Sequence, residues 1–324
     1  MRFCNFAAEN HILSFYFSKV FYGKIMTIKL DWLRGCGTAL VTPFKKDGSI
    51  DDECFKKLVE RQVKNGVKIL IPCGTTGESV TLSEEEKLHV IRMTIEVAHK
   101  LKAKVIAGTG SNNTAAVIEM TRKVRELGAD GALVVAPYYN KPTQEGMLAH
   151  FGEIAKSVKN FPVMLYNVPS RTASNISAET CLKLAEKYEN IVATKEASGN
   201  FSQVMEIISR RPKNFAVFSG DDATTLPLIS VGANGLVSVI SNELPKETSS
   251  MVEKALDGAW TAARKIHYKL LPLMEANFAE ASPAPCKFVM KEMDLLEENL
   301  RLPLVPVTEP TRKKLKEILK DLKK

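Results

Sequence analysis

The sequence of 324 residues has no uninterrupted run of 18 apolar residues, so we expect no transmembrane helix and no membrane partner. It has no C-x-x-C pair, which disfavours a zinc site or a disulfide framework and is typical of free thiols in a reducing cytosol. It has no G-x-S-x-G motif, and no Gly-Lys-Ser/Thr follows its glycine-rich turn, so neither a nucleophilic serine nor a P-loop is expected. The six scattered cysteines are Cys4, Cys36, Cys54, Cys73, Cys181 and Cys286.

Positive charge is in excess, but it is concentrated at the two ends of the chain. The formal net charge is +8, of which residues 312–324 supply +5 and residues 1–26 supply +2. The body of the chain is therefore close to neutral. We interpret the basic C-terminal stretch as the solvated face of an amphipathic helix rather than a nucleic-acid patch.

Eight apolar, β-rich runs alternate with amphipathic helical patterns along the chain. Parallel strands joined by crossover helices give this alternation, and eight such units in about 240 residues predict a (β/α)8 TIM barrel. A doubly wound open sheet is the alternative, although its usual G-x-G-x-x-G is absent from the first run, GCGTALVTP. The runs span residues 35–44, 68–76, 104–110, 131–139, 162–169, 191–197, 215–221 and 235–240.

The chain is predicted to have three parts. Residues 1–25 are apolar but interrupted by Lys19, with no small-residue cleavage site, so we expect an extension outside the fold. Residues 26–257 form the catalytic barrel, in which Ser83-x-x-Glu86 predicts a helix start and Gly128 a helix end. Residues 258–324 contain three further helical patterns and form a C-terminal helical appendage.

A lysine inside an apolar strand is the most informative local feature. In IVATKEASG, Lys195 lies in a run typical of a strand buried on both faces, where an ammonium is costly. One reading is a structural ion pair, for which Glu196 is a poor direct partner because adjacent strand residues face opposite sides. The other is a nucleophilic amine that burial makes reactive towards a ketone, by forming a Schiff base. We found no chemical role for Glu196.

Polar residues at other strand ends suggest partners for this lysine, since catalytic groups of such barrels lie there. Thr75 and Thr76 in CGTTGES can wrap donors around an anion, or form an ordinary turn. Of the adjacent Tyr138 and Tyr139 in PYYN, one can face the barrel mouth and the other a neighbour, or they can simply pack at a subunit contact. Tyr166 and Arg171 in LYNVPSRT can move a proton and clamp a carboxylate, although a tyrosine there is often only packed.

No metal site is expected, and a metal-dependent class II aldolase is therefore disfavoured. The histidines lie in the N-terminal stretch or on helical patterns, where we interpret them as surface or packing residues. They are His11, His89, His99, His150 and His267.

Taken together, several motifs resemble those of the 4-hydroxy-tetrahydrodipicolinate synthases, formerly dihydrodipicolinate synthases. These enzymes belong to the pyruvate-dependent class I aldolases, with N-acetylneuraminate lyase. The resemblance covers about residues 34–310. Its motifs, in family order, are GTTGES, AGTGSNNT, PYYNKPTQEG, YNVPSRT, TKEASGN and SGDDATTLP.

The resemblance implies four catalytic residues. Lys195 matches the lysine that captures pyruvate as an imine, and Tyr166 matches the tyrosine that relays protons above it. Thr75 matches the hydroxyl that links this tyrosine to a second one, Tyr139, which in the family reaches into the neighbouring subunit's site. No external cofactor is implied.

The resemblance also implies a substrate site. Thr76 and its backbone match the pyruvate carboxylate site, and Arg171 matches the residue that meets the carboxylate of L-aspartate 4-semialdehyde. Gly220 and the backbone at Val237 match pocket-lining positions. The implied enzyme is a cytoplasmic homotetramer, a dimer of dimers, of lysine and diaminopimelate biosynthesis.

Two other functions remain open at this point. A lyase for a sugar acid such as N-acetylneuraminate shares the lysine, the tyrosine and the turn, whereas Arg171 and the second tyrosine of PYYN favour the synthase. A non-enzymatic pyruvate-binding regulator is expected to lose part of the lysine, tyrosine and threonine set, all of which is present.

One departure from the family concerns feedback inhibition by lysine. Ser79, Asn112 and Tyr138 agree with the family's lysine site. Glu84 and Lys87 stand at its histidine-like positions, and Ala116 at its glutamate position. Because Lys87 repels a second ammonium and Ala116 removes a partner anion, we expect weak or absent feedback.

Overall fold

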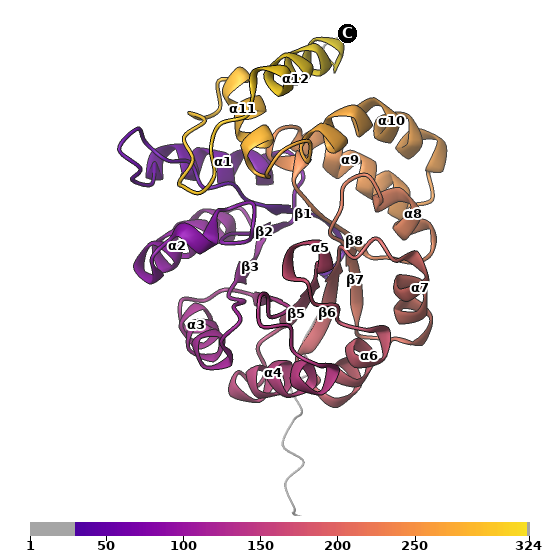
Figure 1. Ribbon diagram of the computed structural model, residues 1–324. Coiled ribbons are helices and arrows are strands. Elements are labelled where there is room, and N and C mark those ends of the chain that lie inside the picture. Colours follow the sequence, from indigo (N-terminus) through magenta and orange to yellow (C-terminus); the bar gives the residue numbers. More distant parts are fainter. Residues whose placement is uncertain (1–29, 323–324) are drawn as a thin grey trace, which may run out of the picture.

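A closed barrel of eight parallel strands forms the centre of the protein. The computed structural model describes residues 30–322, so the predicted extension, residues 1–25, lies outside the described residues. The strands pair in sequence order from β1 to β8, and β8 closes the ring on β1, so the predicted barrel is confirmed and the open sheet is wrong (Figure 1). The strands are β1 Gly35–Ala39, β2 Ile69–Ile71, β3 Lys104–Gly108, β4 Gly131–Val135, β5 Val163–Asn167, β6 Ile191–Glu196, β7 Ala216–Ser219 and β8 Gly235–Ser238.

Most of the predicted runs continue past the true ends of the strands. The predicted run 68–76 contains β2, which ends at Ile71, and the run 131–139 contains β4, which ends at Val135. The remaining residues lie in loops, yet several of them are as buried as a strand, for example Cys73 and Thr76. An apolar run therefore marked burial correctly but did not mark where the ladder of hydrogen bonds stops.

Helices surround the strands in the order expected for this fold (Figure 1). Ser83 caps the second α-helix with both bonds of a capping box: its Oγ accepts from the Glu86 backbone N–H at 3.2 Å, and its own N–H donates to the Glu86 carboxylate at 2.9 Å. Gly128 follows the third with a φ of 93°, as expected of a residue that ends a helix. The helices are α1 Asp52–Lys64, η1 Ser79–Thr81, α2 Glu84–Lys100, α3 Thr114–Glu126, α4 Gln144–Ser157, α5 Pro169–Thr172, α6 Ala178–Lys187, α7 Phe201–Arg210, α8 Thr225–Ser230, η2 Ile240–Asn242 and α9 Pro245–Leu256.

Side chains of each strand alternate between two cores. Ile69, Ile71 and Phe218 fill the inside of the barrel, whereas Leu70 and Val217 pack against the helices. Each fully buried side chain of this size stabilises the fold by about 1.5–3 kcal/mol. This alternation decides which residues at the strand ends face the barrel mouth.

Three helices follow the barrel, as predicted for the C-terminal segment: α10 Trp260–Ala276, α11 Ala284–Glu292 and α12 Glu309–Leu322. In Figure 1, α11 lies beside α1, and Cys286 and Met290 of α11 share a core cluster with Leu58 of α1. On α12, Leu315 and Leu319 are buried while most of the basic side chains face solvent. Within residues 30–322 no helix is long and apolar enough to cross a membrane.

Candidate active site

The ends of β5 and β6 bring Tyr166 and Lys195 side by side. The two residues are paired in the register of the parallel ladder, so both side chains point into the barrel at its carboxyl end. The Lys195 Nζ lies 4.1 Å from the centroid of the Tyr166 ring, and the lysine is only 5% exposed. The chain thus holds an amine in a nearly dry position directly against a phenol.

Gly220, just after β7, leaves the space that the lysine side chain occupies. A Cβ built on Gly220 would lie 2.9 Å from Cε and 3.1 Å from Cγ of Lys195, and 2.8 Å from Cβ of Ala197. These separations are shorter than ordinary contact between carbon atoms, about 3.5–4.0 Å. Any side chain at Gly220 would therefore displace the amine.

Glu196 is not an ionic partner of Lys195, because it projects to the outside of the barrel. Its carboxylate accepts hydrogen bonds from Asn167 Nδ2 at 3.1 and 3.2 Å, from the Ser198 N–H at 2.8 Å and from Gln203 Nε2 at 3.4 Å. Burial raises its pKa, and these hydrogen bonds oppose the rise. Lys195 itself forms no ion pair within residues 30–322, which agrees with the expectation that Glu196 is a poor direct partner.

The Asn167–Glu196 contact gives Glu196 a structural role. Asn167 and Glu196 are paired across the same two strands, one residue beyond Tyr166 and Lys195. Their side-chain hydrogen bonds therefore hold, from outside the barrel, the register that places Tyr166 against Lys195 inside it. Sequence reasoning missed Asn167. The available signal was its position: Asn167 directly follows Tyr166, just as Glu196 directly follows Lys195.

A cavity of about 250 Å³ opens at the barrel mouth above these residues. It brings together Thr75, Tyr166 and Arg171 from three separate predicted motifs, together with Tyr138. Lys195 is not among the lining residues; its Nζ lies 4.1 Å from the centroid of the Tyr166 ring, which does line the cavity.

The other predicted residues lie around this cavity rather than on its wall. Thr76 is 5% exposed and follows Thr75 in the turn, whereas Val237 is buried among the side chains inside the barrel. Tyr139 is 89% exposed and is not among the residues that line the cavity, whereas its neighbour Tyr138 is. The relay from Tyr166 through Thr75 to Tyr139 remains a prediction.

Two local structures present polar groups to the cavity. The turn after β2 is closed by hydrogen bonds from the Gly77 and Glu78 N–H groups to the carbonyls of Gly74 and Thr75, at 3.2 and 3.0 Å. The short helix α5 carries Arg171, whose side chain is exposed and has no hydrogen-bond or ionic partner in the described part of the chain. Its guanidinium is therefore available to an incoming carboxylate.

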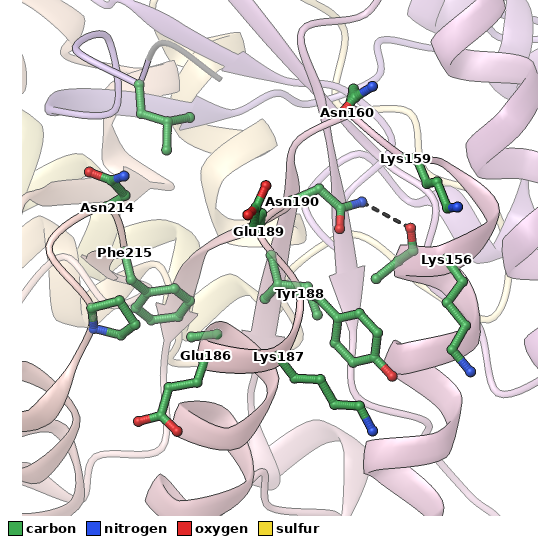
Figure 2. Close-up of a pocket in the computed structure, with 15 residues that line it drawn as sticks. Lys156, Lys159, Asn160, Glu186, Lys187, Tyr188, Glu189, Asn190, Asn214 and Phe215 are labelled. Atoms are coloured by element: carbon green, nitrogen blue, oxygen red, sulfur yellow. Dashed lines mark hydrogen bonds between the residues drawn. The ribbon is translucent and has the colours of Figure 1, made fainter. Parts of the chain in front are cut away.

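A larger cavity lies at the opposite end of the barrel and does not fit this chemistry. It encloses about 670 Å³ and is lined by Asn160, Asn190 and Asn214, which precede β5, β6 and β7 (Figure 2). Asn190 uses its amide to bind carbonyls at the end of α4 and in the connection to β5, for example Ala155 at 3.0 Å. Charged side chains at its rim, such as Lys187, do not converge on one point (Figure 2). In barrel enzymes this end contributes to stability and not to catalysis.

The fold and the position of the lysine are those of the barrel enzymes that work through a lysine amine, the class I aldolase type. No group of histidine, cysteine or carboxylate side chains that could hold a metal ion occurs among residues 30–322.

Comparison with known proteins agrees: the sequence model of the Dihydrodipicolinate synthetase family matches residues 32–322, and the chain belongs to this family. A relative named 4-hydroxy-tetrahydrodipicolinate synthase, from Koribacter versatilis, is 53% identical over 287 residues, which are 88% of this chain and 95% of that protein. The solved dihydrodipicolinate synthase of Aquifex aeolicus is 44% identical and superimposes with a TM-score of 0.87, covering 90% of this chain and 98% of that one.

A third relative is the enzyme of Cyanidioschyzon merolae, solved with lysine bound, which is 42% identical with a TM-score of 0.88 and covers 90% of this chain and 99% of that one. The predicted family and the predicted lyase class are confirmed.

Proposed function

We propose that the chain condenses pyruvate with L-aspartate 4-semialdehyde to give 4-hydroxy-tetrahydrodipicolinate, a step in lysine and diaminopimelate biosynthesis. Its relatives are named for this activity. The observation that carries the proposal is the position of Lys195, 5% exposed and with its Nζ 4.1 Å from the Tyr166 ring, at the carboxyl end of the barrel.

The reaction begins at the Lys195 amine, which adds to the ketone of pyruvate; loss of water gives an imine. The protonated imine withdraws electrons, so a methyl proton leaves and an enamine forms. The enamine carbon attacks the aldehyde of the second substrate. The amine of that substrate then displaces Lys195 from the imine, which closes the ring and returns the free lysine. Because the electron sink is formed on the protein's own lysine, the proposal requires no external cofactor.

The remaining residues serve this sequence by moving protons and holding carboxylates. Tyr166 moves protons to and from the reacting atoms, with Thr75 and Tyr139 as its relay. The turn at Thr76 binds the pyruvate carboxylate, and Arg171 binds the carboxylate of the second substrate. Gly220 and the backbone at Val237 complete the pocket.

We further propose that the enzyme is a cytoplasmic homotetramer, a dimer of dimers, in which Tyr139 of one subunit enters the site of the next. The 89% exposure of Tyr139 in the single chain supports this, because the assembly would cover a large aromatic side chain that otherwise stays in water. Sedimentation of the protein together with a Tyr139→Ala variant tests the assembly. A monomer with full activity would contradict the relay.

The decisive test is reduction with borohydride in the presence of pyruvate, followed by peptide mass analysis. The expected result is a single adduct of reduced pyruvate on Lys195, absent from Lys195→Met. An adduct on another residue, or none, contradicts the assignment. A substrate panel then compares aspartate 4-semialdehyde condensation with the cleavage of N-acetylneuraminate. Faster cleavage of the sugar acid would make the chain a lyase of that class.

A further inference from the structure

The turn that carries Thr75 and Thr76 is tied to the C-terminal helices by a buried ion pair. Glu78 ends this turn, and its carboxylate accepts a hydrogen bond from the Nζ of Lys287 on α11. Both side chains are 0% exposed. The Lys287 Nζ also donates to the Asn299 carbonyl at 2.9 Å, so two of its protons have partners.

A second contact uses the other oxygen of the same carboxylate. The Arg301 N–H donates to Glu78 Oε2 at 3.1 Å, while its guanidinium donates to the Thr81 carbonyl at 2.9 Å. The guanidinium also forms a two-point ion pair with Glu86, at the start of α2. The segment from Lys287 to Arg301 thus holds the turn at Glu78 and, three residues later, at Thr81.

The same segment also holds the loop after β1, which packs against the turn from the other side. The Phe44 ring contacts both Lys287 and Arg301, with the Lys287 Nζ at 4.3 Å and the Arg301 guanidinium carbon at 4.5 Å from its centroid. Within that loop, Thr42 Oγ1 donates to the Gly77 carbonyl at 2.8 Å. A Cβ on Gly77 would lie 3.0 Å from the Leu40 carbonyl oxygen, so the two loops are in tight contact.

The backbone of the turn needs such support. Cys73 and Glu78 both have left-handed φ values, 57° and 53°, which are unfavourable for residues other than glycine. Conformations of this kind persist where the surroundings determine them. A buried ion pair adds little net stability on average, because desolvation offsets the attraction. The contacts therefore fix the shape of the turn more than they stabilise the fold.

We infer that Lys287, acting through Glu78, is a positioning residue that sets the Thr75–Thr76 turn for the pyruvate carboxylate, so the C-terminal segment is part of the active-site structure. This rests on the proposed function of the turn. The Lys287–Glu78 pair also removes a net negative charge next to the turn. The Lys287 ammonium neutralises Glu78, whose carboxylate would otherwise repel the incoming carboxylate two residues away.

The test measures how much pyruvate gives half-maximal borohydride labelling of Lys195. Lys287→Met is expected to raise this concentration about tenfold, because the turn loses its anchor and Glu78 keeps an unpaired charge. Glu78→Gln is expected to raise it less, because the amide still offers one oxygen. The double variant Glu78→Met with Lys287→Met removes both buried charges and is expected to recover melting temperature but not pyruvate affinity.

The half-saturating concentration does not depend on how much protein is folded, so it can be read even for a destabilised variant. Arg312→Met is the matched control, since it breaks an ion pair of the C-terminal segment with Glu298 that does not touch the turn. A wild-type concentration in both Lys287→Met and the double variant overturns the inference. Failure of wild-type protein to be labelled overturns the proposed function instead.

Discussion

Replacing Gly220 by alanine gives a direct test of the candidate site, because one methyl group must enter a space that is already filled. The new Cβ would lie 2.8 Å from Cβ of Ala197 and 2.9 Å from Cε of Lys195. To restore ordinary carbon contacts of about 3.5–4.0 Å, the neighbouring atoms must separate by roughly 0.6–1.2 Å. The Ala197 Cβ is fixed to its backbone, so most of the movement falls on the lysine side chain.

The expected loss of activity is large compared with the loss of stability. A misplacement of about 1 Å costs on the order of 100-fold in rate when it affects a reacting group. Overpacking of this size lowers the free energy of unfolding by about 1–3 kcal/mol. We therefore expect Gly220→Ala to remain folded, with pyruvate labelling of Lys195 and the condensation rate both reduced about 100-fold.

The assay pairs single-turnover borohydride labelling with steady-state condensation and a thermal melt. Gly146→Ala is the control, because it adds the same methyl group on α4, outside the barrel, where its closest new contact is Pro142. A folded Gly220→Ala protein that labels Lys195 at the wild-type rate would refute the geometry that we describe for the amine.

Three further predictions concern residues around the site. Asn167→Leu removes the amide that donates to both oxygens of Glu196, so the free energy of unfolding measured in urea should fall by about 3 kcal/mol; an unchanged value would contradict the bracing role. The hydrogen bonds from Arg301 lower the pKa of Glu86 from 4.5 to about 2, so the folded state binds this proton more weakly than the unfolded state does. The stabilisation from the Glu86–Arg301 interaction is therefore complete above pH 4.5 and is lost as the pH falls to 2. Across that interval in acid titrations, the Glu86→Gln variant should lose less stability than the wild-type protein does. Condensation should continue in millimolar lysine, because the motif resemblance matches Lys87 to a histidine-like position of the family's lysine site; strong inhibition would contradict this.

The barrel was predictable from the sequence because buried strands and amphipathic helices leave alternating apolar runs and helical patterns along the chain. Each strand lies between helices and the barrel interior, so apolar residues continue through it without alternation, and helical patterns lie between the runs. The ends of the strands were not predictable, because Cys73 and Thr76 are buried in a loop. Burial and ladder hydrogen bonding coincide inside a strand but separate beyond its end.

The candidate site was predictable where a polar residue interrupted an apolar run. Lys195 stood out for this reason, and Tyr166 and Arg171 followed from the barrel rule that strand ends converge. Contacts between distant parts of the chain left no such signal. Lys287 lies in an ordinary helical pattern, and its partner, Glu78, is 209 residues away. Pairings of that separation depend on how the helices pack, which no local pattern records.

That separation also has a consequence for the order of events during synthesis. At about 5–20 residues per second, the chain takes roughly 10–40 s to extend from Glu78 to Lys287. Throughout this interval the residues of the first two strands have been made, but the Lys287 ammonium that pairs with Glu78 has not. On the proposed function of the Thr75–Thr76 turn, the last tenth or so of the chain therefore sets the moment at which a site in the first quarter becomes complete.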